Sequence, residues 1–179
     1  PYWKAFLRQK NTILCRSPAF SWYFAATAKD APTALVLTRQ NLPQLGGSSR
    51  EALKGGYILE DSAKETPDAI LMASGSEVSL AVDAKKLLAE EGIDVRVVSM
   101  PSMDVFAKQD AEYREKVLPK AVRKRVAVEA LSGFGWGEYV GLDGAYVTMQ
   151  GFGASAPAES LFEKFGFTAE HVAEVVKGL

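Results

Sequence analysis

The feature that most constrains the fold is a strand–helix–strand pattern between residues 69 and 99. Ala69–Ala73 is an uninterrupted apolar run, Gly75-Ser76-Glu77 is a turn, and the apolar residues between Val78 and Ala89 recur at helical spacing. Val95–Ser99 is a second apolar run. Two strands joined by a helix are parallel neighbours with a right-handed crossover, so the chain is expected to contain a parallel sheet.

The same alternation continues toward the C-terminus. Further strands are predicted at 57–59, 125–129 and 145–149, and helices from 101, at 111–118, at 158–165 and at 169–177. The Thr168 hydroxyl is expected to cap the last helix, with Glu170 and His171 in its first turn. The sequence therefore predicts an α/β fold, in which an open, mostly parallel sheet is covered by helices on both faces.

The N-terminal third is organised differently. Residues 1–33 show no sustained period beyond a short apolar helix around Trp22, and Ala34–Thr38 is an apolar strand whose carboxyl end presents Arg39. Residues 44–56 are rich in glycine, serine and charge, which is typical of an exposed connector. A domain boundary is therefore expected in this segment.

Composition excludes several classes of function. The 21 basic and 22 acidic residues give no overall charge that would favour nucleic acid or an anionic membrane. A single histidine, His171, and a single cysteine, Cys15, argue against a His-cluster metal site, a thiolate metal cage and an internal disulfide. No apolar run approaches the ~18 residues of a spanning helix, and no signal-peptide pattern is present. A cytoplasmic setting is the expectation.

The candidate functional residues follow the predicted strands, because open parallel sheets bind ligands beyond the carboxyl ends of their strands. Gly75 and Ser76 form a turn that could hold an anion, or an ordinary helix start capped by Ser76. Glu129 ends a buried strand and is either a perturbed acid or a structural cap or ion-pair partner. Arg39 is either a fork for a phosphate or part of a salt bridge at the rim.

Two other patterns have structural interpretations. The glycine pairs at 133–135 and 151–153 resemble nucleotide loops, but they lack a third glycine or the chain that must follow, so dinucleotide binding is not expected. Phe152, Phe162, Phe165 and Phe167 are expected to form core that packs the last two helices onto the sheet, and His171 is expected at the surface or in the cap.

The sequence resembles transketolase from about residue 21 to the C-terminus. The motifs that carry the resemblance are TRQNLP (38–43), GGYILEDS (55–62), ASGSEVSLAVDA (73–84), VVSMPSMDVFAKQDAEYREKVLP (97–119), RVAVEA (125–130), YVGLDG (139–144) and FGASAPAESLFEKFGFT (152–168). The resemblance implies that residues 1–44 are a remnant of the pyrimidine-binding domain, with 1–20 unassigned. It further implies a linker at 45–56 and the family's C-terminal domain, a five-stranded mixed sheet with flanking helices, at 57–179.

The resemblance also implies an activity and its cofactors. Transketolases transfer a two-carbon ketol unit between sugar phosphates in the pentose phosphate pathway, using thiamine diphosphate and a Mg or Ca ion. The domain that holds the cofactor and metal is not among the matched motifs, so no catalytic residue and no metal ligand are expected here, and the chain alone is expected to be inert. Arg39 matches the arginine that binds the sugar phosphate in the complete enzyme. The expected partner is the N-terminal part of transketolase or a homodimer partner.

Two alternatives remain open from the sequence. The loops around Gly75, Glu129 and Gly153 could form a regulatory module that binds a nucleotide or another anion. The chain could also be the C-terminal subunit of a split transketolase whose N-terminal half is another polypeptide.

Overall fold

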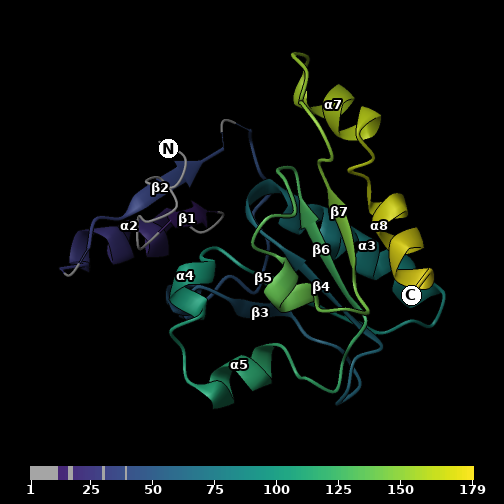
Figure 1. Ribbon diagram of the computed structural model, residues 1–179, viewed down its shortest axis with the longest axis horizontal. Helices are drawn as coiled ribbons and strands as arrows, with labels where there is room; N and C mark the ends of the chain where they lie inside the picture. Colours follow the sequence, from purple (N-terminus) through teal and green to yellow (C-terminus); the bar gives the residue numbers. More distant parts are fainter. Residues whose placement is uncertain (1–11, 16–17, 30, 39) are drawn as a thin grey trace.

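The computed structural model describes residues 12–15, 18–29, 31–38 and 40–179. Its N-terminal part contains strand β1 (Thr12–Cys15), helix α2 (Pro18–Thr27) and strand β2 (Ala34–Leu37). β1 and β2 pair in parallel and form a two-stranded sheet of their own, to one side of the main sheet (Figure 1). Such a small sheet cannot bury both of its faces.

The main sheet has five strands, as expected. In chain order they are β3 (Tyr57–Glu60), β4 (Ala69–Ala73), β5 (Val95–Ser99), β6 (Arg125–Glu129) and β7 (Ala145–Thr148). Their order across the sheet is β3-β5-β4-β6-β7, with β3 antiparallel to β5 and every other neighbouring pair parallel. The predicted mixed, mostly parallel sheet is therefore confirmed, and β4 lies at its centre.

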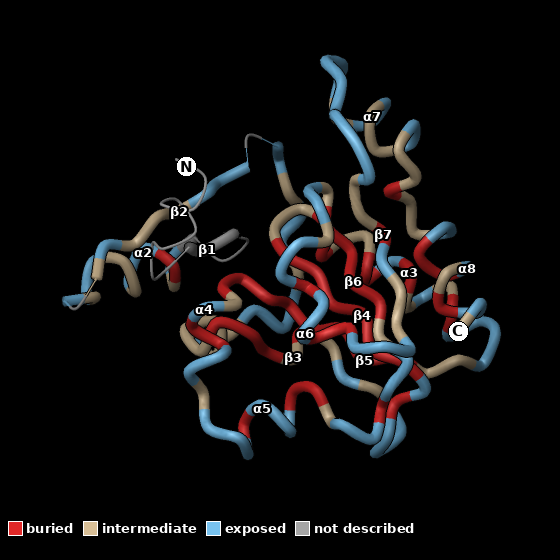
Figure 2. Tube along the Cα trace, in the orientation of Figure 1, coloured by how far each residue is buried: buried red, intermediate tan, exposed pale blue. Residues whose placement is uncertain are grey.

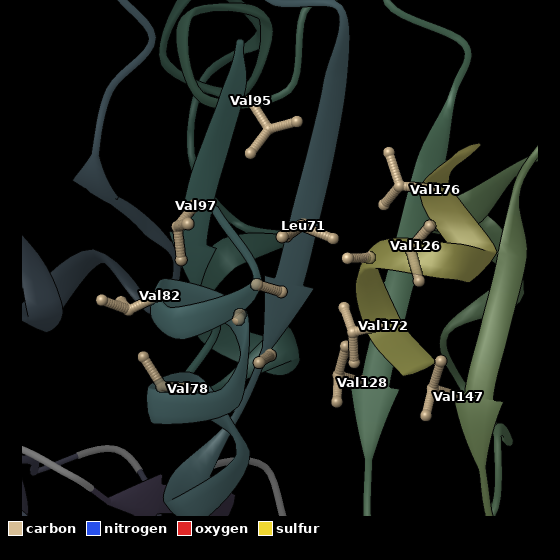
Figure 3. Packing of buried hydrophobic residues seen from close by; sticks show 14 of the residues in the cluster. Leu71, Val78, Val82, Val95, Val97, Val126, Val128, Val147, Val172 and Val176 are labelled. Atoms are coloured by element: carbon tan, nitrogen blue, oxygen red, sulfur yellow. The ribbon is translucent and has the colours of Figure 1, made fainter. Parts of the chain in front are cut away.

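One face of the sheet is covered by two helices. Val78 and Val82 of α3 (Val78–Glu90) and Val172 and Val176 of α8 (Ala169–Lys177) pack on Leu71 and the other side chains of that face (Figure 3). The Thr168 hydroxyl accepts a 3.2 Å hydrogen bond from the backbone N–H of His171, which confirms the predicted cap of α8.

The opposite face carries a second core. Ile70 and Met72 alternate with Leu71 along β4 and therefore point to this face, where three short helices cover them. These helices are α4 (Met103–Phe106), α5 (Ala111–Val117) and α6 (Gly137–Val140). Figure 2 shows β4 and β5 buried along their length, and their side chains divide between the two cores. The architecture is therefore three layers, as predicted.

The predicted phenylalanine core is only partly correct. Phe167 is buried, and its ring centroid lies 5.6 Å from that of Phe162, which belongs to helix α7 (Ala158–Lys164). Phe152, in contrast, is fully exposed in the loop after β7. Its spacing from the other phenylalanines resembled core spacing, but the loop extends away from the sheet and leaves the ring without a contact surface (Figure 2).

The segment expected to be a linker contains a short 3-10 helix, η1 (Arg50–Lys54), with Ser49 as its cap. Gly55 follows at φ +83°, and a Cβ at this position would lie 2.4 Å from the backbone nitrogen of Phe106. Ser102 also donates a 2.9 Å backbone hydrogen bond to the Gly55 carbonyl. The last part of this segment is therefore packed against the main domain, and the exposed positions lie before it.

Candidate functional site

The candidate site lies where β4 and β6 end. The register pairs Ala73 of β4 with Val128 of β6, so the next residues, Ser74 and Glu129, are also side by side. The Ser74 hydroxyl donates a 2.6 Å hydrogen bond to Oε2 of Glu129, and both side chains are buried. Two residues that are 55 positions apart in sequence are therefore joined at the edge where such sheets bind ligands.

Glu129 is held by donors from three directions. Besides Ser74, the Trp136 side chain and the backbone N–H of Leu131 form hydrogen bonds with its carboxylate. Burial raises the pKa of Glu129 above its ordinary value, and these three hydrogen bonds oppose part of that rise. The carboxylate thus fixes the start of the loop after β6 to the turn after β4.

Glu77 adds a second buried carboxyl to the same place. It is 5% exposed, and burial together with the neighbouring charge of Glu129 raises its pKa to about 7. The Ser76 hydroxyl donates a 2.9 Å hydrogen bond to Oε1 of Glu77. Near neutral pH this pair of carboxyls can hold one proton, because two adjacent buried carboxylates do not both ionise readily.

Gly75 and Ser76, the predicted anion-binding turn, lie beside these carboxyls. They belong to the 3-10 turn η2 (Gly75–Glu77), in which Gly75 has a φ of +54°. The alternative expectation, that Ser76 caps the helix, is wrong: α3 begins at Val78 with no side-chain cap, and the Ser76 hydroxyl bonds to Glu77 instead. The capping prediction missed that a buried carboxylate competes for this hydroxyl.

The other candidate residues from the sequence are Arg39, His171 and the loop that contains Gly153. Arg39 lies outside the described residues, although β2 ends two positions before it and the backbone N–H of Gln40 bonds to the Thr38 hydroxyl. His171 is exposed in the first turn of α8, as expected. The loop that contains Gly153 follows β7, so the three loops of the predicted anion module do emerge along one edge of the sheet.

Sequence reasoning missed a buried arginine in the middle of β5. Arg96 is 7% exposed, bonds to Oδ1 of Asp61 at 2.7 Å and donates to the Lys116 carbonyl at 2.8 Å. An arginine flanked by valines in an apolar strand is the signal that could have revealed it, because a buried guanidinium requires acceptors. Its partners are structural, and they fix the end of α5 to the sheet.

The described residues do not offer a site for a divalent metal ion. Among them, no group of three or more His, Cys, Asp or Glu side chains is arranged to hold one. Glu77 and Glu129 are a pair, and their neighbours are hydroxyls and an indole. The residues described here therefore do not fit the metal-held diphosphate of a thiamine enzyme, and no catalytic step is derived through it.

Comparison with protein families identifies the domain. Residues 55–168 match the family model of the transketolase-like TK C-terminal domain. This chain belongs to that family. The match covers the whole five-stranded sheet and ends just before α8. It begins at Gly55, where the packing of the main domain also begins.

Individual transketolases extend the match beyond this domain. The chain is 53% identical over 165 residues to the transketolase of Bacillus subtilis, which covers 90% of this chain and 25% of that protein. A solved transketolase from Leishmania mexicana superposes with a TM-score of 0.85 at 42% identity, covering 93% of this chain and 25% of that one. The chain thus spans about a quarter of the length of the relatives it matches.

A second solved structure shares the fold. It is described as a split gene transketolase in an inactive β4 tetramer, and it matches with a TM-score of 0.65 at 24% identity. The match covers 84% of this chain and half of that one. Separately, no helix of the described residues combines the length and the apolar character that crossing a bilayer requires.

Proposed function

We propose that this chain supplies the C-terminal part of a transketolase, an enzyme that transfers a two-carbon ketol unit from a ketose phosphate to an aldose phosphate. The observation that carries the proposal is the 53% identity to a transketolase over 165 residues, which covers 90% of this chain. Thiamine diphosphate and its Mg or Ca ion are held by the remaining part of the enzyme. The setting proposed for the reaction is the cytoplasm.

The contribution of this chain is structural and positional. The C-terminal domain presents a rigid edge, built by Ser74, Glu77 and Glu129, to the rest of the enzyme. Arg39 binds the phosphate of the sugar substrate through charge-assisted hydrogen bonds, because it comes two positions after the end of β2 and a guanidinium matches the geometry of a phosphate. The partner that completes the site is the N-terminal part of a transketolase or a homodimer partner.

A separate proposal concerns the turn at Gly75 and Ser76. An anion binds there only while Glu77 is protonated, because an ionised carboxylate at this position repels it. Sugar phosphate titrations followed by calorimetry at pH 6 and pH 8 test this role. Heat of binding that is present at pH 6 and absent at pH 8 would support anion binding at this turn. Equal heats at the two pH values, or no heat at either, would contradict it.

The test of the main proposal uses the isolated chain. Calorimetric titration with thiamine diphosphate in the presence of Mg²⁺ is expected to show no saturable binding, and a ketol transfer assay is expected to show no turnover. Saturable micromolar binding of the cofactor would contradict the division of roles proposed here. The same titration of the complete Bacillus subtilis enzyme is the positive control.

A further inference from the structure

Two loops of this domain lack the charge that a solvent-facing surface normally carries. Residues 131–137 follow β6 and residues 150–157 follow β7, and neither stretch contains an Asp, Glu, Lys or Arg. In the whole chain, 24% of the residues are charged. Because surface loops are usually polar and charged, two neutral loops at one edge of the sheet indicate a surface that does not face water.

These loops also expose large apolar side chains. Phe152 is 102% exposed, Phe134 is 77% exposed and Leu131 is 61% exposed. Every residue from 150 to 157 is exposed, and this loop extends away from the domain at the top of Figure 2. Each of these side chains keeps apolar area in contact with water, and apolar side chains gathered at one place on a surface are typical of an interaction site.

The two loops begin side by side. The backbone N–H of Met149 donates a 2.9 Å hydrogen bond to the Leu131 carbonyl, which extends the pairing of β6 and β7 into the loops. Gly133 lies against Tyr146 of β7, since a Cβ added there would be 3.3 Å from the tyrosine ring. Leu131, Phe134, Tyr146 and Phe152 are called the loop patch below.

The loop patch has a rigid base. Trp136 is 1% exposed, bonds to the buried Glu129 and donates its backbone N–H to the Gly133 carbonyl at 3.2 Å. Phe134 is therefore held outward between two anchored positions and does not fold back onto the core. Rings presented in this way lose little conformational entropy on binding and are suited to anchor an interface.

We propose that the loop patch docks onto the N-terminal part of a transketolase. The inference rests on the proposed function, because about three quarters of the length of each relative lies outside the part matched here and is available to contact this domain. The absence of charge and the aromatic side chains are typical of the core of a permanent interface.

A second apolar surface favours this partner over a second copy of the chain. Trp22 and Tyr23 of α2 and Val36 and Leu37 of β2 are each about half exposed, and they lie outside the C-terminal domain. A two-fold contact through the loop patch alone would leave this surface uncovered. A large partner that contacts both surfaces would cover the two together.

The experiment co-expresses the chain with the affinity-tagged N-terminal three quarters of the Bacillus subtilis transketolase. The native C-terminal quarter of that enzyme is co-expressed as a reference. The variants are the double substitution Phe134→Ser/Phe152→Ser, the single substitution Phe152→Ser, and the matched control Leu142→Ser. Leu142 is 98% exposed but lies in the turn before β7, at the opposite end of that strand from the loop that carries Phe152.

The wild-type chain and Leu142→Ser are expected to copurify with the tagged part. The double variant should bind at least tenfold more weakly, and Phe152→Ser should be intermediate. Amide hydrogen exchange at residues 131–137 and 150–157 should slow in the complex. Circular dichroism of each variant confirms the fold, which is expected to survive because the rings are exposed.

Three results would overturn the inference. They are equal binding by the double variant and the wild type, no copurification of the wild type, and self-association through the loop patch without binding to the tagged part. The proposed function fails separately. A complex that forms through the loop patch but transfers no ketol unit would refute the proposed function and support the interface. Ketol transfer at the same rate by the wild type and the double variant would support the proposed function and refute the interface.

Discussion

Ser74 and Glu129 are joined by a 2.6 Å hydrogen bond that crosses from the end of β4 to the end of β6. The bond exists because these strands are neighbours in the sheet although a third strand, β5, lies between them in sequence. It connects the turn that begins α3 with the loop that carries Phe134. The hydroxyl of Ser74 and the buried carboxylate of Glu129 therefore hold these two segments together.

Replacing Ser74 with alanine should destabilise the domain. The substitution removes one donor from the buried carboxylate of Glu129, and a hydrogen bond to a charged group contributes about 1.5–3 kcal/mol. We expect a loss of about 2 kcal/mol in the free energy of unfolding, measured by urea denaturation at pH 8. The matched control is Ser79→Ala, since Ser79 donates only to the Ser76 carbonyl of its own helix start and alanine favours helix. A loss in Ser79→Ala as large as in Ser74→Ala would contradict the account.

Replacing Glu77 with glutamine should stabilise the domain at alkaline pH. The folded pKa of about 7 lies above the ordinary value of 4.5, so the unfolded chain releases this proton first as the pH rises. Wild-type stability should therefore fall between pH 4.5 and pH 7, by about 3 kcal/mol, and then level off. Glu77→Gln lacks this loss, so its advantage should be absent below pH 4.5 and complete above pH 7.

The control for this pH dependence is Asp83→Asn. Asp83 lies on the exposed side of α3, the helix that follows Glu77, and it pairs there with Lys86. Its removal should leave the pH dependence of the unfolding free energy as it is in the wild type. Urea denaturation at several pH values measures all three proteins. If Glu77→Gln raised the free energy of unfolding by the same amount at pH 4 and pH 8, the Glu77 carboxyl would not be the titrating group.

Limited proteolysis should cut the chain before η1. Residues 40–48 are mostly exposed, whereas Gly55 and Gly56 are buried against Met100 and Phe106. Treatment with a protease of broad specificity is therefore expected to leave a stable fragment that begins between residues 41 and 50, identified by its mass. Loss of the 57–179 region before any cut in 40–48 would show that the C-terminal domain does not fold independently.

Arg39→Ala should affect phosphorylated substrates selectively. In a hybrid enzyme that carries this chain, the substitution removes charge-assisted hydrogen bonds of about 1.5–3 kcal/mol each, so the KM for a ketose phosphate should rise tenfold or more. An unphosphorylated ketol donor should be hardly affected, and Arg39→Lys should recover only part of the loss because an ammonium cannot form the fork. Steady-state kinetics with both donors measures this. Equal losses for both would assign Arg39 a structural role.

Much of the fold could be predicted because its signals are local. The apolar runs at Ala69–Ala73, Val95–Ser99 and Arg125–Glu129 predict three strands with the bounds that the structure has. The Thr168 cap could be predicted for the same reason, since a cap depends on residues three positions apart. The antiparallel direction of β3 came from the resemblance to transketolase, because four residues carry no signal of direction.

The site could be predicted only in part because its contacts are distant in sequence. Glu129 was identified as a candidate from its place at the end of a strand, but its bond to Ser74 depends on the strand order. The raised pKa of Glu77 depends on the same neighbour. The expectation that Phe152 belongs to the core is wrong, because aromatic spacing does not distinguish a side chain that packs on its own domain from one that is exposed in a loop.

The most direct test of the account is the activity of a hybrid enzyme. In this hybrid, the matched 165 residues of the chain replace the C-terminal quarter of the Bacillus subtilis transketolase. The account predicts ketol transfer that depends on thiamine diphosphate and a divalent metal ion, and no transfer by the chain alone. A hybrid that folds and assembles like its parent, by circular dichroism and sedimentation, yet transfers no ketol unit would contradict it.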